Sequence, residues 1–233
     1  MKTKHPLNSI QMSSSFLVPY VRWGELNVGW GELRVASAQF TEFKTAVIEN
    51  IQSTLTKENG VLEFQAVIKQ EHPNELCVFE VYKDKEAYRT HIQSLHYKQF
   101  GASVGPIIKN KALYDVIPVV LGRKQHAFRS AYVRIAELEI YPEYFEGYQK
   151  AVTEEIEISI SSEPEVLAIY SVALKDSPAH LRFLEFYANE QAYLQHRESV
   201  HFQNYLAITK SMIKSRKLFE AESIMPGFKS IKG

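Results

Sequence analysis

The chain has 233 residues, and its 27 basic and 27 acidic side chains leave no formal net charge. No run of Lys and Arg is longer than a pair, so the sequence lacks the basic patch of a nucleic-acid-binding protein. The single cysteine, Cys77, cannot form an intramolecular disulfide, and no apolar run approaches the ~20 residues of a membrane span. We therefore expect a cytoplasmic protein without nucleic-acid or membrane partners.

The first predicted strand has two alternative registers. Residues 1–20 contain Ser and Pro and lack periodicity, so we expect a disordered or loosely packed arm there. Beyond it, Trp23-Gly24-Glu25-Leu26-Asn27-Val28 is nearly repeated by Trp30-Gly31-Glu32-Leu33-Arg34-Val35, and either copy can supply the strand. The choice leaves the fold unchanged but decides which side chains line a site.

A helix and a hairpin follow this strand. Apolar residues recur every three or four positions from Phe40 to Leu55, which predicts an amphipathic helix that ends at Asn59-Gly60. Residues 61–68 and 76–82 are rich in β-branched and aromatic residues and flank a turn that contains Pro73, as in a hairpin.

A second helix and a fourth strand complete the unit. The helix begins after the polar turn at residues 83–86 and restarts at Ser94, which is typical of an N-cap. Residues 111–117 form the last strand. The resulting order, strand-helix-strand-strand-helix-strand, is that of a ferredoxin-like domain.

The whole unit recurs 105 residues later. Residues 28–115 align without a gap with residues 133–220, at roughly one identity in four. We therefore predict an α+β chain with two ferredoxin-like domains. The predicted boundaries are 21–117 for the first domain, 118–127 for a linker, 128–225 for the second domain and 226–233 for a tail.

The two sheets are expected to pack on each other. In each domain both helices cover one face of the sheet, so the other face must be buried by something else. The second copy can bury it by closing an eight-stranded barrel with the helices outside, which side chains can fill or which can hold one small ligand. Further dimerisation of the fused barrel stays open.

Equivalent glutamates on the first strands are candidates for a general base. Glu32 and Glu137 occupy the same place in the two copies, and the alternation of apolar residues can direct both into the barrel. Burial there would raise their carboxyl pKa values and suit proton abstraction. The alternative is an edge carboxylate bonded to a neighbour such as Arg34 or Arg134.

Each hairpin ends in an alternating Glu-x-Tyr pair, Glu80 with Tyr82 and Glu185 with Tyr187. Alternation along a strand puts the two members of a pair on one face of the sheet. A phenol beside a carboxylate can bind and deprotonate a phenolic substrate, and the resulting anion can react with O2 without a metal. Alternatively, the Glu braces the neighbouring helix and the Tyr fills the barrel with its hydroxyl satisfied.

A Tyr-His pair lies on the second helix of each copy. His91 follows Tyr88 by three residues, and His196 follows Tyr193 in the same way, so each pair shares a helical face. A neutral imidazole at the barrel mouth suits proton transfer near pH 7, although an imidazole bonded to a backbone carbonyl is as good an interpretation.

A second histidine follows each of these by five residues. On a continuous helix, His96 would point roughly 140° away from His91, and His201 from His196, so we expect no shared metal ion. Both second histidines are better explained as residues of the helix restart.

The motif that contains these residues resembles a known family. Glu-x-Tyr, a four-residue polar turn and Ala-Tyr-x-x-His-x-x-Ser-x-His-[Phe/Tyr] occur at residues 80–97 and 185–202. This pattern resembles the antibiotic biosynthesis monooxygenase family of dimeric α/β-barrel proteins, which usually build the barrel from two chains. The family includes cofactor-free monooxygenases of quinols or anthrones, haem-degrading proteins and an isomerase of a phosphorylated sugar. Haem-degrading members carry an inward Asn on the first strand, which neither residues 28–35 nor 133–140 contain.

The resemblance implies a cofactor-independent monooxygenase that oxidises a small aromatic or quinol-like molecule with O2 inside one half of the barrel. The alternatives are an isomerase of a phosphorylated sugar or keto compound, which requires Lys or Arg at the barrel mouth, and a non-enzymatic ligand- or haem-binding protein. Because residues 132–140 are closer to the family pattern, we expect the second half to hold the working site. The predicted catalytic residues are Tyr187, His196, Glu185, Glu137, Tyr82 and His91, and the predicted substrate-binding residues are Tyr193, Tyr170, Arg134, Trp30 and Tyr88.

Overall fold

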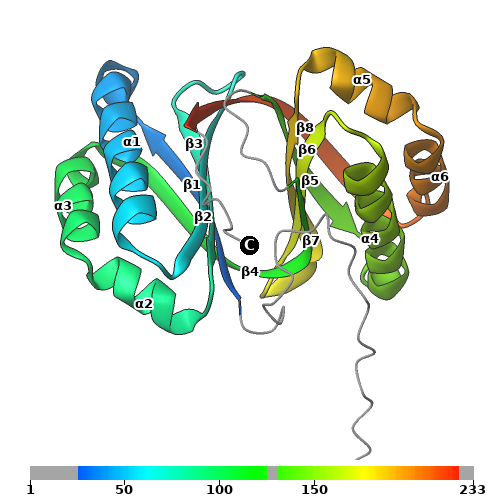
Figure 1. Cartoon of the computed structure of the whole chain (residues 1–233), viewed down its shortest axis with the longest axis horizontal. Helices are drawn as coiled ribbons and strands as arrows, with labels where there is room; N and C mark the ends of the chain where they lie inside the picture. The colour runs from blue at the N-terminus through cyan, green and yellow to red at the C-terminus, as the bar shows by residue number, and fades with distance from the viewer. Residues whose placement is uncertain (1–25, 125–130, 226–233) are drawn as a thin grey trace, which may run out of the picture.

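The two predicted sheets join into one closed barrel of eight strands with the helices outside (Figure 1). The computed structural model describes residues 26–124 and 131–225. Around the barrel the strands follow the order β1-β3-β2-β8-β5-β7-β6-β4, and every neighbouring pair is antiparallel. The predicted α+β class and the barrel built from two ferredoxin-like halves of one chain are confirmed.

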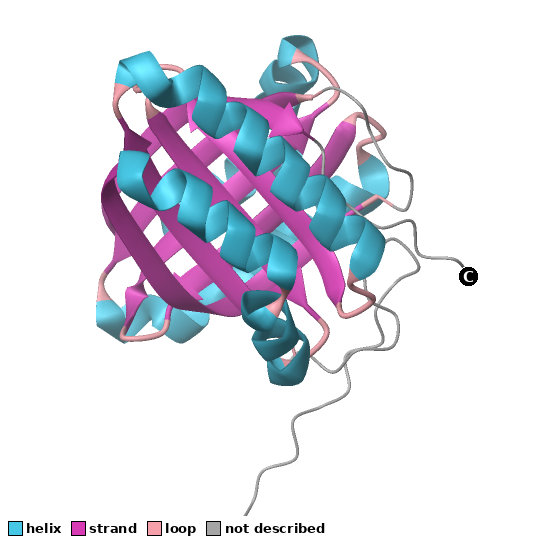
Figure 2. Cartoon of the chain, turned by 90° about the vertical axis from the view of Figure 1, so that its left-hand side faces the viewer, coloured by secondary structure: helices cyan, strands magenta, loops and turns pink. Residues whose placement is uncertain are grey.

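Both halves contain the same elements in the same order. The first half has β1 (Asn27–Val35), α1 (Phe40–Lys57), β2 (Val61–Lys69), β3 (Glu75–Tyr82), α2 (Lys85–Gln93), α3 (Leu95–Val104) and β4 (Ile108–Arg123). The second half has β5 (Tyr132–Ile140), α4 (Phe145–Ser162), β6 (Val166–Leu174), β7 (Ser177–Tyr187), α5 (Glu190–Glu198), α6 (Val200–Thr209) and β8 (Ile213–Met225). Figure 2 views the first half from its helix side and shows the helices lying across the outer face of the strands.

The register of the first strand follows the gapless repeat. β1 contains the second of the two similar stretches, from Trp30 to Val35, and it pairs with both β3 and β4. Its counterpart β5 begins 105 residues later, at Tyr132. The alternative register rests on residues 20–25, which lie outside the described residues, as do the predicted arm and the tail.

The last strand of each half extends into the other half. β4 continues through Pro118 to Arg123 and pairs with β6, although residues 118–127 were predicted to be a linker. The ladder shifts register between Pro118 and Val120, and such a bulge accommodates a residue without a backbone N–H. Pro118 was therefore wrongly interpreted as the end of the strand. The equivalent extension of β8 pairs with β2, so these two long strands close the barrel.

The second helix of each half is broken at a serine, as predicted. Ser94 has an extended backbone, with φ −63° and ψ 151°, and its hydroxyl accepts a hydrogen bond of 3.3 Å from the Tyr97 N–H. Ser199 caps α6 in the same way through the Phe202 N–H. The chain changes direction at each cap, so helical periodicity does not relate residues on its two sides.

The barrel interior is filled by side chains from both halves. Alternation directs Trp30, Phe79, Tyr170 and Phe186 into one buried apolar cluster inside the barrel. A polar group lies beside it, in which the Gln65 amide donates to Glu63 at 2.8 Å and the Tyr170 hydroxyl donates to the same carboxylate. The opposite faces of the sheet pack against the helices in two separate apolar clusters, one for each half.

Across residues 26–124 and 131–225, none of the helices combines the length and the apolar character needed to span a membrane.

Candidate active site

A cavity of about 430 Å³ lies in the first half, between the sheet and its covering helices. It is on the helix side of the sheet, whereas the sequence analysis placed the site inside the barrel. Gly29 helps to open it, because β1 presents no side chain there, and an added Cβ would make only ordinary contact with Glu80 Oε2 at 3.6 Å. The polar residues of the lining are Asn27, Asn50, Glu80, Tyr88, His91, Tyr97, Lys111, Tyr114 and Asp115.

His91 presents a buried imidazole to this cavity from the last turn of α2. The side chain is 1% exposed, and its Nδ1 lies 2.9 Å from Oε1 of Glu58, the residue that ends α1. An ionised carboxylate can only accept, so this contact places a proton on Nδ1, and the lone pair of the neutral ring is then on Nε2. Among the described residues, Nε2 has no hydrogen-bond partner. His91 therefore lines the cavity with one ring nitrogen held by Glu58 and the other unpaired.

Asn50 contributes a second unpaired polar atom to the same cavity. It lies on α1, is 4% exposed, and its Oδ1 finds no partner within the described chain. Buried polar atoms are nearly always hydrogen-bonded, and an unmade bond costs about 1–3 kcal/mol. Asn50 and His91 thus each carry an unpaired buried polar atom, and both residues line the same cavity.

The Glu80 and Tyr82 side chains are joined to each other. The Tyr82 hydroxyl donates to Glu80 Oε2 at 2.7 Å, and Glu80 lines the cavity. Burial raises the pKa of Glu80, although the nearby His91 and the bond from Tyr82 act against the shift. Burial also raises the pKa of Tyr82, and the Glu80 carboxyl adds to it. Tyr82 therefore stays protonated and positions Glu80 instead of acting as a base.

The equivalent cavity of the second half has a volume of only about 90 Å³. Arg134 takes the place of Gly29, and its guanidinium lies 5.0 Å from the centre of the Tyr193 ring. Tyr148 and Tyr205 replace two phenylalanines of the first half, and their hydroxyls are 2.6 Å apart. Larger side chains thus fill most of the space that is open in the first half.

The predicted residues of the second half do converge on this smaller cavity. Glu185, Tyr187, Tyr193 and His196 all line it, and Tyr187 donates to Glu185 at 2.9 Å. Both ring nitrogens of His196 face carboxylates, since Nδ1 is 2.8 Å from Glu163 and Nε2 is 3.6 Å from Glu155. Glu155 occupies the place of Asn50, and burial raises its pKa to about 7. The imidazole is therefore less free to bond a ligand than that of His91.

Three of the predicted site residues lie on the barrel side of the sheet, although Trp30 also borders the first cavity. Trp30 and Tyr170 pack in the interior cluster.

Glu137 bonds to Lys69 at 2.9 Å. Burial acts to raise the pKa of Glu137, but the bond and the charge of Lys69 outweigh it and lower the pKa. The expectation of a raised pKa at Glu137 was therefore wrong. Glu32 contacts the Trp30 indole N–H at 3.2 Å and Arg182 at 3.7 Å.

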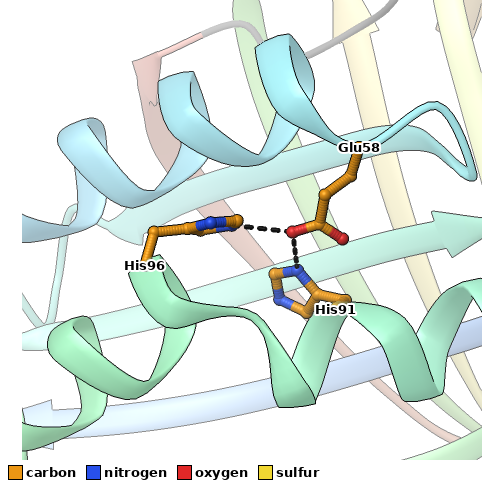
Figure 3. A group of neighbouring side chains, drawn as sticks. All are labelled: Glu58, His91 and His96. Atoms are coloured by element: carbon orange, nitrogen blue, oxygen red, sulfur yellow. Dashed lines mark hydrogen bonds and ion pairs between the residues drawn. The ribbon is translucent and has the colours of Figure 1, made fainter.

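His91 and His96 converge on one carboxylate (Figure 3). Glu58 Oε1 lies 2.9 Å from His91 Nδ1 and 2.7 Å from His96 Nε2. The expectation that the two imidazoles point apart was wrong, because the cap at Ser94 redirects the chain between them. His196 and His201 converge on Glu163 in the same manner, at 2.8 Å each.

Sequence reasoning missed Asn50, Glu58 and Asn27. Asn50 and Glu155 are polar residues on the otherwise apolar face of the long helix, which is a signal that the helical pattern contained. Glu58 follows the helix end and gave no such signal. Asn27 is the first residue of β1 and lines the cavity, so the first strand does contain an Asn, one residue before the stretch 28–35 that was expected to lack one.

Comparison with known proteins identifies the repeated unit. The family model described as antibiotic biosynthesis monooxygenase matches residues 31–103 and again residues 131–207. A search of curated proteins found no match. Two solved bacterial structures, each named a "putative monooxygenase", share the whole architecture. That of Lactobacillus acidophilus NCFM is 25% identical, with a TM-score of 0.83 over 88% of this chain and 96% of its own. That of Fusobacterium nucleatum is 20% identical, with a TM-score of 0.82 over 90% and 96%.

Proposed function

The chain belongs to the antibiotic biosynthesis monooxygenase family, and on that premise we propose that it oxidises a small phenolic or quinol-like molecule with O2, without a cofactor, in the cavity of its first half. The observation that carries the proposal is a pair of unpaired buried atoms, His91 Nε2 and Asn50 Oδ1, on two residues that line one cavity. The second half was the expected site, but its cavity is about a fifth as large, from about 90 against about 430 Å³.

Proton abstraction is the first step that the cavity supports. The hydroxyl of a phenolic substrate donates to His91 Nε2, and the proton moves to that nitrogen. Glu58, bonded to Nδ1, orients the ring and stabilises the imidazolium that forms. Asn50 Oδ1 can accept a hydrogen bond from a second hydroxyl of the substrate. The step leaves an electron-rich phenolate in a mostly apolar enclosure.

Oxygen then reacts with this anion directly. The phenolate transfers one electron to O2, and the radical pair combines to form a carbon-peroxide bond. His91 returns its proton to the peroxide, and loss of the ring hydrogen with cleavage of the O–O bond gives a quinone and one water. One substrate and one O2 thus yield one quinone and one H2O, with both oxygen atoms accounted for.

An oxygen-electrode assay tests the proposal. Naphthols and hydroquinones are supplied to the protein in the presence of EDTA, and O2 uptake is corrected for autoxidation. His91→Gln should lower kcat by about 100-fold or more, since a positioned general base contributes 10²–10⁴-fold. The matched variant His196→Gln should stay within about twofold of wild type. Equal losses in both variants, or no enzyme-dependent uptake with any substrate, would contradict the proposal.

One observation keeps an isomerase as the second candidate. That activity requires a cation to hold a phosphate, and Lys111 lines the first cavity. Asp115 and Glu80 line it as well, which makes the cavity less favourable for a phosphate. If a sugar phosphate bound there, Lys111→Met would weaken its binding and leave the oxidation of an uncharged naphthol unchanged. Binding of sugar phosphates by titration calorimetry distinguishes the two functions.

A further inference from the structure

The cluster of Glu58, His91 and His96 in Figure 3 brings three metal-ligating atoms together. Glu58 Oε1, His91 Nδ1 and His96 Nε2 lie within 4.8 Å of one another, and none of the three side chains is more than 13% exposed. We propose that this cluster binds a divalent transition-metal ion such as Zn²⁺ or Co²⁺, and that its counterpart in the second half binds another.

The donor set suits these ions. Two imidazoles and one carboxylate are the ligands that Zn²⁺ and related ions take at open sites, with a remaining position for water. Bonds of 2.0–2.1 Å in a tetrahedron separate neighbouring ligand atoms by about 3.3 Å, so the present contacts of 2.7 and 2.9 Å must widen by about half an ångström. The nitrogen that binds the ion must carry a lone pair. A neutral imidazole meets this need when its proton lies on the other nitrogen, so coordination does not require a neutral histidine to lose a proton.

Two hydroxyls complete the surroundings of the cluster. Thr54 Oγ1 lies 3.2 Å and Ser94 Oγ lies 3.3 Å from His96 Nε2. A water bound to the ion would therefore find hydrogen-bonding partners beside it, as the outer surroundings of metal sites usually supply.

The second half has the same arrangement although its cavity is much smaller. Glu163 Oε1 lies 2.8 Å from both His196 Nδ1 and His201 Nε2. The hydroxyls recur too, with Ser159 at 3.2 Å and Ser199 at 3.1 Å from His201 Nε2. If such a cluster served only to orient a base toward a substrate, it would have no use in the second half, where the cavity is nearly closed. A metal ion explains it in both halves.

If the proposed function is correct, an ion bound in the first half would also affect the oxidation reaction. Coordination through Nδ1 leaves the proton of His91 on Nε2, so the nitrogen proposed as the base becomes a donor and can no longer accept a proton. Bound metal should therefore inhibit oxidation.

Metal titration of the full chain tests the site without any substrate. The protein is stripped with EDTA, transferred to metal-free buffer and titrated with ZnCl2 by calorimetry, and with CoCl2 by visible absorption. We expect two ions per chain. His96→Ala and His201→Ala should each remove one ion, and the exposed His72→Ala should remove none. Stoichiometry below one in wild type, or unchanged in both variants, would overturn the proposal.

A second measurement does not depend on the variants folding. In wild type, paramagnetic Co²⁺ should shift the imidazole NMR signals of the four cluster histidines and leave those of His72 and His180 in place. Shifts confined to the latter two would overturn the site. The two proposals can fail separately. If stripped protein oxidises naphthols but binds no ion, the proposed function stands and the metal site is wrong. If the protein binds ions but oxidises naphthols only when loaded, the metal site stands and the cofactor-free function is wrong.

Discussion

The two halves share one backbone plan but differ in what occupies the space between sheet and helices. The first half encloses about 430 Å³ and the second about 90 Å³. Gly29 faces this space in the first half where Arg134 stands in the second, and Asn50 corresponds to Glu155. The two halves thus share the elements that build the barrel, while a few larger or charged side chains make one cavity smaller than the other.

The same comparison separates two roles of the histidines. His91 and His196 are both held by a glutamate through Nδ1, at 2.9 and 2.8 Å. Only His91 leaves Nε2 without a partner among the described residues, because Glu155 lies 3.6 Å from Nε2 of His196. A similar position in the fold therefore does not imply the same chemistry, and exchanging residues between the halves tests the difference.

The largest effect is expected from giving the first half the arginine of the second. In Gly29→Arg, the introduced guanidinium can lie against Tyr88 and near Asp115, which occupy the places of Tyr193 and Glu220, and would block the cavity. We expect kcat/KM for oxidation to fall by on the order of 100-fold or more. Oxygen uptake measures the loss, and circular dichroism checks the fold.

The reciprocal variant Arg134→Gly is the control for this exchange. It should leave oxidation within about twofold of wild type, since it changes only the second half. If Arg134→Gly abolished oxidation while Gly29→Arg did not, the working site would lie in the second half, as the sequence indicated.

A smaller loss is expected from exchanging the residue that faces the imidazole. In Asn50→Glu, a carboxylate would lie beside His91 Nε2, as Glu155 does beside His196, and its charge would favour the protonated imidazole, which has no lone pair to act as a base. We expect kcat to fall by on the order of 30-fold. Oxygen uptake of Asn50→Glu is compared with that of Glu155→Asn, which should match wild type. No loss in Asn50→Glu would mean that the free Nε2 is not used.

The sequence repeat was sufficient to predict the barrel, because the barrel depends on apolar patterns that extend over whole strands and helices and occur in both copies. The alternation of strands and the spacing of the long helices were readable in both copies, and the serine caps were recognised. The length of β4 was not, because a bulge at Pro118 depends on pairing with β6, a strand of the other half. Strand ends that are set by distant partners leave no local signal.

The candidate site was only partly predictable for a related reason. The Glu, Tyr and His residues of the motif do gather on the helix side of each sheet. Which side of the sheet would hold the cavity, and which half would keep it open, depends on the volumes of side chains that meet from separate elements. Glu58 and His96 were missed as partners because the angle between two histidines was calculated along a helix that Ser94 interrupts.

Inside the barrel, Tyr170 tests whether the interior takes part in the function. Its hydroxyl donates to the buried Glu63, and its ring stacks on Phe79 with centroids 5.0 Å apart. Tyr170→Phe keeps the ring and removes the bond, which should lower the free energy of unfolding by about 2 kcal/mol in urea denaturation. Oxidation should be unchanged. A tenfold loss of activity with unchanged stability would instead support the predicted role of Tyr170 in binding substrate.

The smallest expected effect concerns the ion pair that joins the halves, Lys69 of β2 with Glu137 of β5 at 2.9 Å. Burial opposes the ionised form of Glu137, but the bond and charge of Lys69 lower its pKa below that of the unfolded chain. The stabilisation is therefore complete above the unfolded pKa of about 4.3 and is lost as the pH falls through the folded value. Between pH 7 and pH 3.5, wild type should therefore lose more of its free energy of unfolding than Glu137→Gln. Urea denaturation of both proteins at each pH isolates this difference, because all other carboxyl groups are common to the two chains.

The opposite result would be a steeper loss of the free energy of unfolding in Glu137→Gln than in wild type. It would show that the buried Glu137 destabilises the protein and that its pair with Lys69 does not hold the two halves together.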